Sequence, residues 1–124
     1  VVCSGAHTAL DIPKTLEVLE TLGVAVVGYG TDKFPEFFFS EGQCKVPARV
    51  DTVKEVAEFV RITFYDIKLK NGIILANPVP KEEEADPLKV REYIDIAIKE
   101  LKEKKISGSD VTPFLLKRVS EMSG

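Results

Sequence analysis

The chain has 124 residues, of which 44% are hydrophobic and 30% are charged, as in a globular protein with its own core. Its formal net charge of −3 offers no basic surface for nucleic acid, and no apolar run approaches the length of a membrane span. No secretory signal is visible. We therefore expect a protein of the cytoplasm or of an organelle, with neither nucleic acid nor membrane as a partner.

The two cysteines and the first residues of the chain give two further expectations. Cys3 and Cys44 are too few for a disulfide framework, so we expect free thiols in a reducing compartment. The chain also begins inside an apolar stretch, without a methionine or a lead-in. That start favours the interpretation that the sequence is part of a longer protein.

The first stretch predicts a strand, a turn and a helix. Residues 1–3 are typical of the end of a buried strand, and the small residues at 4–6 allow a tight turn. Asp11 and Pro13 then open a helix over 12–22, with the carboxylate as cap and the proline in the first turn.

A second buried strand is predicted at 24–29, where a short apolar run is rich in β-branched residues. Gly23 ends the helix before it, and a turn-forming cluster follows at 28–32.

Four phenylalanines lie within six residues, and we call residues 34–39 the phenylalanine segment. One interpretation is an aromatic plug that packs beneath a loop. The alternative is the wall of a ligand pocket or a subunit contact. The next residues, 40–50, are predicted to form an irregular loop, because Pro47 argues against a central strand.

The second half continues the alternation of helices and strands. A capping-box pattern at 52–55 predicts a helix to about residue 68, and Asn-Gly at 71–72 breaks it. Residues 73–77 predict a third buried strand, followed by an extended proline-rich end at 78–80.

Two more helices complete the chain. The acidic loop at 81–86 is expected to be solvated rather than metal-binding. A long helix is predicted at 87–105, and a last one from Thr112. The buried side of the long helix is expected to consist of Val90, Ile94, Ala97 and Leu101.

Strands separated by helices form βαβ units, which predict an α/β fold with a mostly parallel sheet flanked by helices in α/β/α layers. Three strands make a sheet too small to cover both layers of helices well. We therefore expect an incomplete fragment of a larger single domain. Ligands bind outside the carboxyl ends of such strands, so a site is predicted at 3–8, 28–32 and 76–80, here called the strand-end rim. His7, the only histidine, lies there.

Common catalytic motifs are absent from the sequence. It contains no GxGxxG, Walker A, CxxC or HExxH pattern. Ser4 and His7 are three residues apart, but no G-x-S-x-G elbow surrounds the serine. A metal centre built on one histidine and scattered carboxylates has no supporting spacing either.

Several runs of the sequence carry a resemblance to one family, and they cover essentially the whole chain in the family's order. They are residues 1–24, 26–29 (Val-Val-Gly-Tyr), 34–37 (Phe-Pro-Glu-Phe), 76–80 (Ala-Asn-Pro-Val-Pro), 106–108 (Ile-Ser-Gly) and 111–121. The chain thereby resembles the second half of the pseudouridine-5′-phosphate glycosidases, also called indigoidine synthase A-like proteins. The family's full chain is more than twice as long.

The resemblance implies an enzyme that breaks the C–C glycosidic bond of pseudouridine 5′-phosphate, a small phosphorylated nucleoside. Uracil and ribose 5-phosphate result, with a divalent metal, usually Mn²⁺. A lysine amine attacks C1′ of the opened ribose and forms a Schiff-base-type adduct, because a C–C bond offers no heteroatom leaving group. The resemblance places the proton-donating glutamate, the metal-binding aspartate and the phosphate-binding groups outside this chain. It also implies a homotrimer.

The nucleophilic lysine is where the sequence departs from the family. The family's Cys-Ala-Gly-Ala-Lys corresponds to residues 3–7, which end in His7. Imidazole has no primary amine and cannot form the imine, but it can act as a base, a metal ligand or a phosphate donor. Lys14 is the nearest amine, about two helical turns away.

Three hypotheses follow. The chain is the C-terminal portion, residues 1–124, of an active glycosidase domain, or it belongs to a catalytically inactive homologue that binds a phosphorylated nucleoside or sugar. A generic α/β domain without this link ranks last. Residues 1–124 alone are expected to be inactive.

Overall fold

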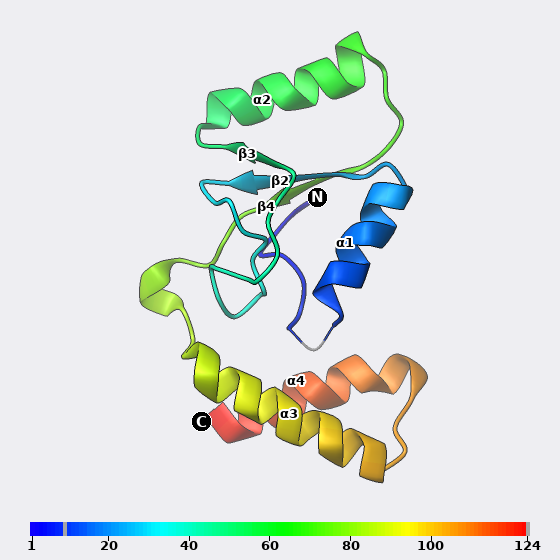
Figure 1. Ribbon diagram of the computed structural model, residues 1–124, viewed down its shortest axis with the longest axis vertical. Coiled ribbons are helices and arrows are strands. Elements are labelled where there is room, and N and C mark those ends of the chain that lie inside the picture. The colour runs from blue at the N-terminus through cyan, green and yellow to red at the C-terminus, as the bar shows by residue number, and fades with distance from the viewer. Residues whose placement is uncertain (9, 124) are drawn as a thin grey trace.

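The computed structural model describes residues 1–8 and 10–123. Its helices and strands are β1 (Val2–Cys3), α1 (Ile12–Thr21), β2 (Ala25–Tyr29), β3 (Ala48–Val50), α2 (Val53–Arg61), β4 (Ile73–Ala76), α3 (Pro87–Glu103) and α4 (Val111–Ser123). Helix α2 lies at one end of the long axis of the molecule and α3 with α4 at the other, with the sheet and α1 between them (Figure 1). In the described ranges, no helix is both long and apolar enough to span a bilayer.

The four strands form one parallel sheet in the order β1-β4-β2-β3. Since successive strand residues point to opposite faces, the apolar strands can cover a helix on each side. Val26 and Ile74 pack with residues of α1, whereas Val27 and Leu75 lie on the side of α2. The predicted α/β class, with a parallel sheet between helices, is confirmed.

One strand was not predicted. Residues 48–50, in the segment expected to be an irregular loop, form β3 and pair with β2 through Val27↔Ala48 and Tyr29↔Val50. Pro47 stands directly before this strand. Because β3 is an edge strand, a proline at its start removes no hydrogen bond from the centre of the sheet. The sheet therefore has four strands rather than three.

The predicted helix caps are present. The Asp11 carboxylate accepts the N–H of Lys14 at 3.1 Å, and Thr52 and Glu55 form a reciprocal capping box. The second helix departs from the prediction, because regular α-helix ends at Arg61 and a π-helical turn follows over Ile62–Asp66. The capping signals are local in sequence, and for this reason they were readable without the fold.

Helices α3 and α4, here called the helical pair, have a core of their own. The buried residues of that core are Phe39, Val90, Ile94, Ala97, Leu115 and Val119. Three of the four residues predicted for the inner side of the long helix are in it, and Leu101 packs against it while partly buried. The helical pair is thus a separate unit rather than a cover for the sheet.

The phenylalanine segment connects these two cores. Phe34 is 2% exposed and belongs to the sheet core, whereas Phe39 is 1% exposed and belongs to the core of the helical pair. The burial expected for an aromatic plug is confirmed for these two rings, but they pack into two separate cores rather than beneath a loop. Phe38 is partly buried against the helical pair, and Phe37 is exposed.

One apolar face is left open to solvent. Val1 and Val2 are 85% and 68% exposed at the sheet edge, so the prediction of a buried first strand is wrong for the described chain. Helix α2 has no buried residue, although apolar side chains recur along it at helical spacing. Val53 and Ile67, in and just after that helix, are 74% and 61% exposed.

We expect residues 1–124, expressed alone, to self-associate, because these exposed apolar side chains favour contact with other apolar surface. Replacing Val53 and Ile67 by lysine should reduce the association, whereas Leu88→Lys, on the helical pair, should not. Sedimentation velocity and thermal unfolding measure this. A parent chain that is monomeric and unfolds cooperatively would contradict the expectation.

We expect Phe39→Ala to lower the free energy of unfolding by about 3–5 kcal/mol, since it removes a large ring from a closed core. Leu88→Ala, at a side chain that is 81% exposed, is the matched control and should stay within about 0.5 kcal/mol of the parent. Urea denaturation of the complete gene product measures both. Equal stability of the two variants would show that Phe39 does not hold the helical pair.

Candidate functional site

The three predicted strand ends meet at one edge of the sheet. Ala76 is the register partner of both Cys3 and Gly28, so β1, β4 and β2 reach the same level at their carboxyl ends. The N–H of Asn77 donates to the carbonyl oxygen of Cys3 at 2.9 Å and extends this contact beyond the strands. The parallel sheet thus brings the residues of the strand-end rim together as expected.

The remaining side chains of the rim differ in their surroundings. The Asp32 carboxylate forms an ion pair with Arg49 of β3 at 2.6 Å, on the surface. Asn77 is exposed. Cys3 is a half-buried free thiol, and so is Cys44. The segment that holds His7 contacts the phenylalanine segment.

The phenylalanine segment holds residues 4–8 in place by main-chain contacts. The N–H of Phe37 donates to the carbonyl of Ser4 at 3.0 Å, and the hydroxyl of Thr8 donates to the carbonyl of Glu36 at 2.9 Å. Between them, Gly5 and Glu36 form an antiparallel bridge. A two-stranded contact of this kind fixes the course of the backbone on both sides of His7.

Gly5 makes this close approach possible. Its φ is +84°, and a Cβ at this position would lie 1.7 Å from the carbonyl oxygen of Pro35. Both the backbone conformation and the space therefore require glycine. In place of the tight turn predicted at 4–6, the chain bends at Ser4 and Gly5 forms the bridge to Glu36.

His7 is half-buried among aromatic rings. Its ring centroid lies 5.9 Å from that of Phe37 in a stacked arrangement and 5.4 Å from that of Phe38 in an edge-on arrangement. Burial lowers the pKa of His7, because the charged imidazolium loses water there. The imidazole is therefore neutral near pH 7 and can accept a proton or coordinate a metal.

Phe37 has an unusual backbone conformation for a bulky residue. Its φ is +64°, in the left-handed region, which costs about 1–3 kcal/mol for a residue other than glycine. Its side chain is 45% exposed. The hydrogen bond to Ser4 and one from the N–H of Glu36 to the carbonyl of Phe39, at 3.1 Å, hold the strained backbone. The sequence pattern contained no signal for this conformation.

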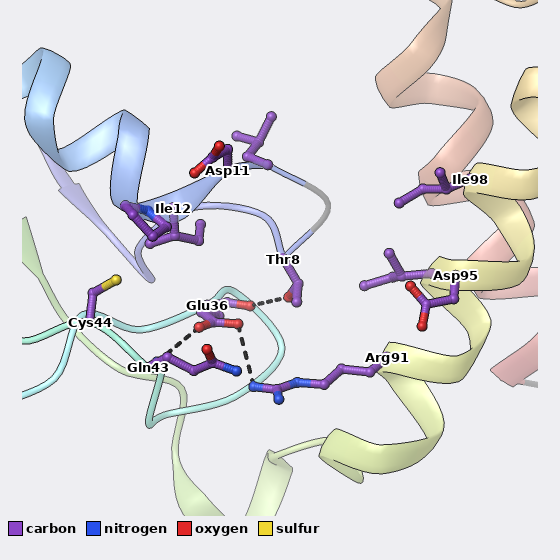
Figure 2. A pocket seen from close by; sticks show the side chains of 12 residues that line it. Thr8, Asp11, Ile12, Glu36, Gln43, Cys44, Arg91, Asp95 and Ile98 are labelled. Atoms are coloured by element: carbon purple, nitrogen blue, oxygen red, sulfur yellow. Dashed lines mark hydrogen bonds and ion pairs between the residues drawn. The ribbon is translucent and has the colours of Figure 1, made fainter.

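A buried carboxylate joins the phenylalanine segment to the helical pair. The Glu36 side chain is 6% exposed, its carboxylate accepts the N–H of Gln43 at 3.0 Å, and the Arg91 guanidinium lies 3.8 Å away. Figure 2 shows Arg91 extending from α3 towards Glu36. Arg91 also lies over the ring of Phe39, 5.7 Å from its centroid. Sequence reasoning missed this pair, because nothing local links the two residues.

A cavity of about 320 Å³ lies beside this ion pair, between α3, the start of α1 and the phenylalanine segment (Figure 2). Thr8, Glu36 and Arg91 are among its lining residues, and His7 is not. The cavity therefore adjoins the segment that holds His7 without including that side chain.

The acidic loop at 81–86 has a structural role that was not predicted. The carboxylate of Glu84 accepts both the N–H and the hydroxyl of Ser40, at 2.9 and 3.1 Å. Asp86 caps α3 by accepting the N–H groups of Leu88 and Lys89. The expectation of a solvated loop is wrong for Glu84, which is partly buried against Ser40, whereas Asp86 is exposed.

Lys14, the other amine considered from the sequence, does not line the same surface as His7. Lys14 is exposed on α1 and lines a shallow groove of residues 10–19 that does not include His7. Within residues 1–8 and 10–123, no group of three or more His, Cys, Asp or Glu side chains is placed to hold a metal ion. The described residues thus do not fit Mn²⁺ by themselves.

Comparison with known families matches residues 1–124 to the family described as indigoidine synthase A like protein. A pseudouridine-5′-phosphate glycosidase of Solibacter usitatus is 44% identical over 124 residues, which cover 100% of this chain and 41% of that relative. One of Legionella pneumophila is 47% identical over 123 residues, covering 99% and 39%. The chain spans about two fifths of the length of these relatives.

Two solved structures have the same fold. The prealnumycin C-glycosynthase AlnA, in complex with ribulose 5-phosphate, superimposes with a TM-score of 0.86 at 30% identity, over 98% of this chain and 39% of that one. An indigoidine synthase A-like protein of Thermotoga maritima gives a TM-score of 0.80 at 35% identity, with the same coverage of 98% and 39%. The resemblance inferred from the sequence is confirmed.

We expect the pKa of His7 to make folding stability fall as the pH drops below about 6.5, the ordinary pKa of an exposed imidazole. In that window the unfolded chain binds a proton that the folded chain binds less readily, because burial lowers the pKa in the folded state. Above about pH 6.5, His7 contributes no pH dependence to the folding stability.

Urea denaturation of the complete gene product between about pH 5 and about pH 7.5 measures the effect, with His7→Gln as the control that cannot titrate. The parent should lose more stability than the variant at the acid end. Identical profiles for the two proteins would show that His7 titrates alike in both states.

Proposed function

Because the chain belongs to the indigoidine synthase A-like protein family, we propose that the complete protein cleaves the C–C glycosidic bond of pseudouridine 5′-phosphate, releasing uracil and ribose 5-phosphate. The observation that carries this proposal is the identity of 44–47% to pseudouridine-5′-phosphate glycosidases over essentially the whole chain. A structural relative named as a C-glycosynthase, solved with ribulose 5-phosphate, supports the same class of bond and a sugar phosphate.

In this proposal, residues 1–124 are the C-terminal portion of the catalytic domain and supply the strand-end rim. His7 occupies the position of the family's nucleophilic lysine. A neutral imidazole cannot form an imine, so the role we assign to His7 is proton transfer to or from the substrate, and the amine that forms the adduct with the opened ribose would have to come from the remainder of the protein. The exposed position of Lys14 on α1 argues against this amine as a substitute.

The cofactor and the assembly extend the same proposal. Mn²⁺ or another divalent metal is expected from the family, and its ligands would come from the remainder of the protein, since the described residues contain no suitable cluster. A homotrimer is also proposed. The exposed apolar side chains along α2 and β1 support a further polypeptide contact, either within the chain or between subunits.

A second candidate function is favoured by one residue. Histidine at position 7 removes the amine on which the family's Schiff-base chemistry depends. A homologue that has lost catalysis would still bind a phosphorylated nucleoside or sugar at the strand-end rim.

The test incubates the complete gene product with Mn²⁺ and pseudouridine 5′-phosphate and follows uracil release by liquid chromatography. We expect turnover by the parent, and a loss of about 100-fold or more in His7→Gln if the imidazole transfers a proton. Lys14→Met should retain the parent rate. Borohydride reduction followed by mass spectrometry locates any amine that forms an adduct with the sugar.

Each other outcome has a defined meaning. Turnover by His7→Lys alone would establish an inactive homologue on a competent scaffold. Loss of activity in Lys14→Met would move the nucleophile to that residue. Absence of turnover with retained ligand binding would favour the second candidate, and absence of binding would overturn the transfer of function from the family.

A further inference from the structure

We propose that the ring of Phe37 is the stacking surface for the planar base of the substrate, beside position 7. The identity of the ligand as a pyrimidine base rests on the proposed function. The existence of an aromatic stacking surface rests on three observations about Phe37 itself, which concern its exposure, its backbone and its neighbours.

The first observation is that Phe37 does not join either core. Its side chain is 45% exposed, whereas Phe34 and Phe39, at the two ends of the same segment, are 2% and 1% exposed. A large apolar ring gains from burial, and both neighbouring cores were within reach of this short segment. Burial in one of the two cores therefore does not account for the position of this ring.

The second observation is the left-handed backbone of Phe37. Among the described residues, the other non-glycine residues with positive φ are Lys68 and Lys105, which stand near helix ends with long polar side chains. Phe37 has a positive φ in a loop instead, held by its hydrogen bond to Ser4 and by one from the N–H of Phe38 to the carbonyl of Glu36, at 2.7 Å. Strained backbone of this kind clusters at ligand-binding sites.

The third observation is the direction in which the ring is presented. It stacks on His7 with an interplanar angle of 30° and meets the ring of Phe38 nearly at right angles, with centroids 5.0 Å apart. The ring is thus fixed beside the strand-end rim and still partly open. A base stacked on it would lie next to position 7, where the proposed reaction acts on the bond between base and sugar.

The chemistry of the surface selects the base over the rest of the substrate. An aromatic face binds a heterocycle by stacking, which does not depend on hydrogen bonds. The ring of Phe37 lies against the imidazole of His7 and the ring of Phe38, and a phenyl face itself carries no group that could donate a hydrogen bond to phosphate. Phe37 should therefore contribute to affinity for the nucleotide and not to affinity for the sugar phosphate.

The experiment measures the dissociation constants of pseudouridine 5′-phosphate and of ribose 5-phosphate by calorimetry, with Mn²⁺ present throughout. Both ligands are measured in the parent and in the His7→Gln background, so that the loss of the His7 ring affects both measurements alike. Phe37→Ala and Phe37→Gly should weaken nucleotide binding by about 10-fold or more and leave ribose 5-phosphate unchanged. Phe37→Tyr should retain nucleotide binding.

Two controls separate stacking from a structural role. Tyr65→Ala removes an aromatic ring that is 73% exposed, in the turn after α2, and should change neither constant. Phe37→Gly should unfold at no lower temperature than Phe37→Ala, because glycine adopts a positive φ without strain. Retained folding with selective loss of nucleotide binding supports the proposal.

Other results overturn it. Unchanged nucleotide affinity in Phe37→Ala, or an equal loss for both ligands, would show that Phe37 does not stack on the base, while the proposed function would stand. If the protein with native Phe37 binds neither compound, in the parent and in the His7→Gln background alike, both proposals fail. If it binds ribose 5-phosphate alone, the base has no subsite and the stacking proposal fails.

Discussion

The burial of one phenylalanine in each of two cores is the constraint on which the rest of this structure depends. Phe34 is enclosed by the sheet and α1, and Phe39 by the helical pair, at the two ends of one short segment. Burial of a phenylalanine side chain is worth about 1.5–3 kcal/mol, so these two rings set where the segment begins and ends. The two buried rings therefore restrict the path that the backbone between them can take. Their carbonyl and N–H groups meet residues 4–8, and this contact places His7.

The polar contacts of the phenylalanine segment orient it more than they stabilise it. The Glu36–Arg91 pair is separated by 3.8 Å, and the Arg91 side chain is 40% exposed, so its net contribution is at most about 1 kcal/mol. The bonds from Ser40 to Glu84 satisfy groups that would otherwise be left without a partner inside the protein, which matters more than their net gain. Apolar burial therefore holds the helical pair to the sheet. The charged groups fix the orientation of the helical pair relative to the phenylalanine segment.

The surroundings of position 7 are compatible with a histidine and with the lysine of the family. Aromatic rings and partial burial lower the pKa of the imidazole, since the charged form loses water. A lysine ammonium in the same place would lose water too, and its pKa would fall in the direction that an amine nucleophile requires. The scaffold around position 7 is in this sense compatible with the chemistry of the family, although the side chain in this chain is different.

Features that depend on neighbouring residues could be predicted from the sequence alone. The caps at Asp11 and at Thr52, three of the four strands, the parallel α/β arrangement and the meeting of three strand ends all follow from short-range patterns. The family followed from motifs in order along the chain. Three features could be seen only in the folded chain. They are the burial of Phe34 and Phe39, the pairing of residues 48–50 with β2, and the contact between Arg91 and Glu36. Each of these depends on contacts between segments far apart in sequence, and no local pattern encodes which distant segment a side chain will meet.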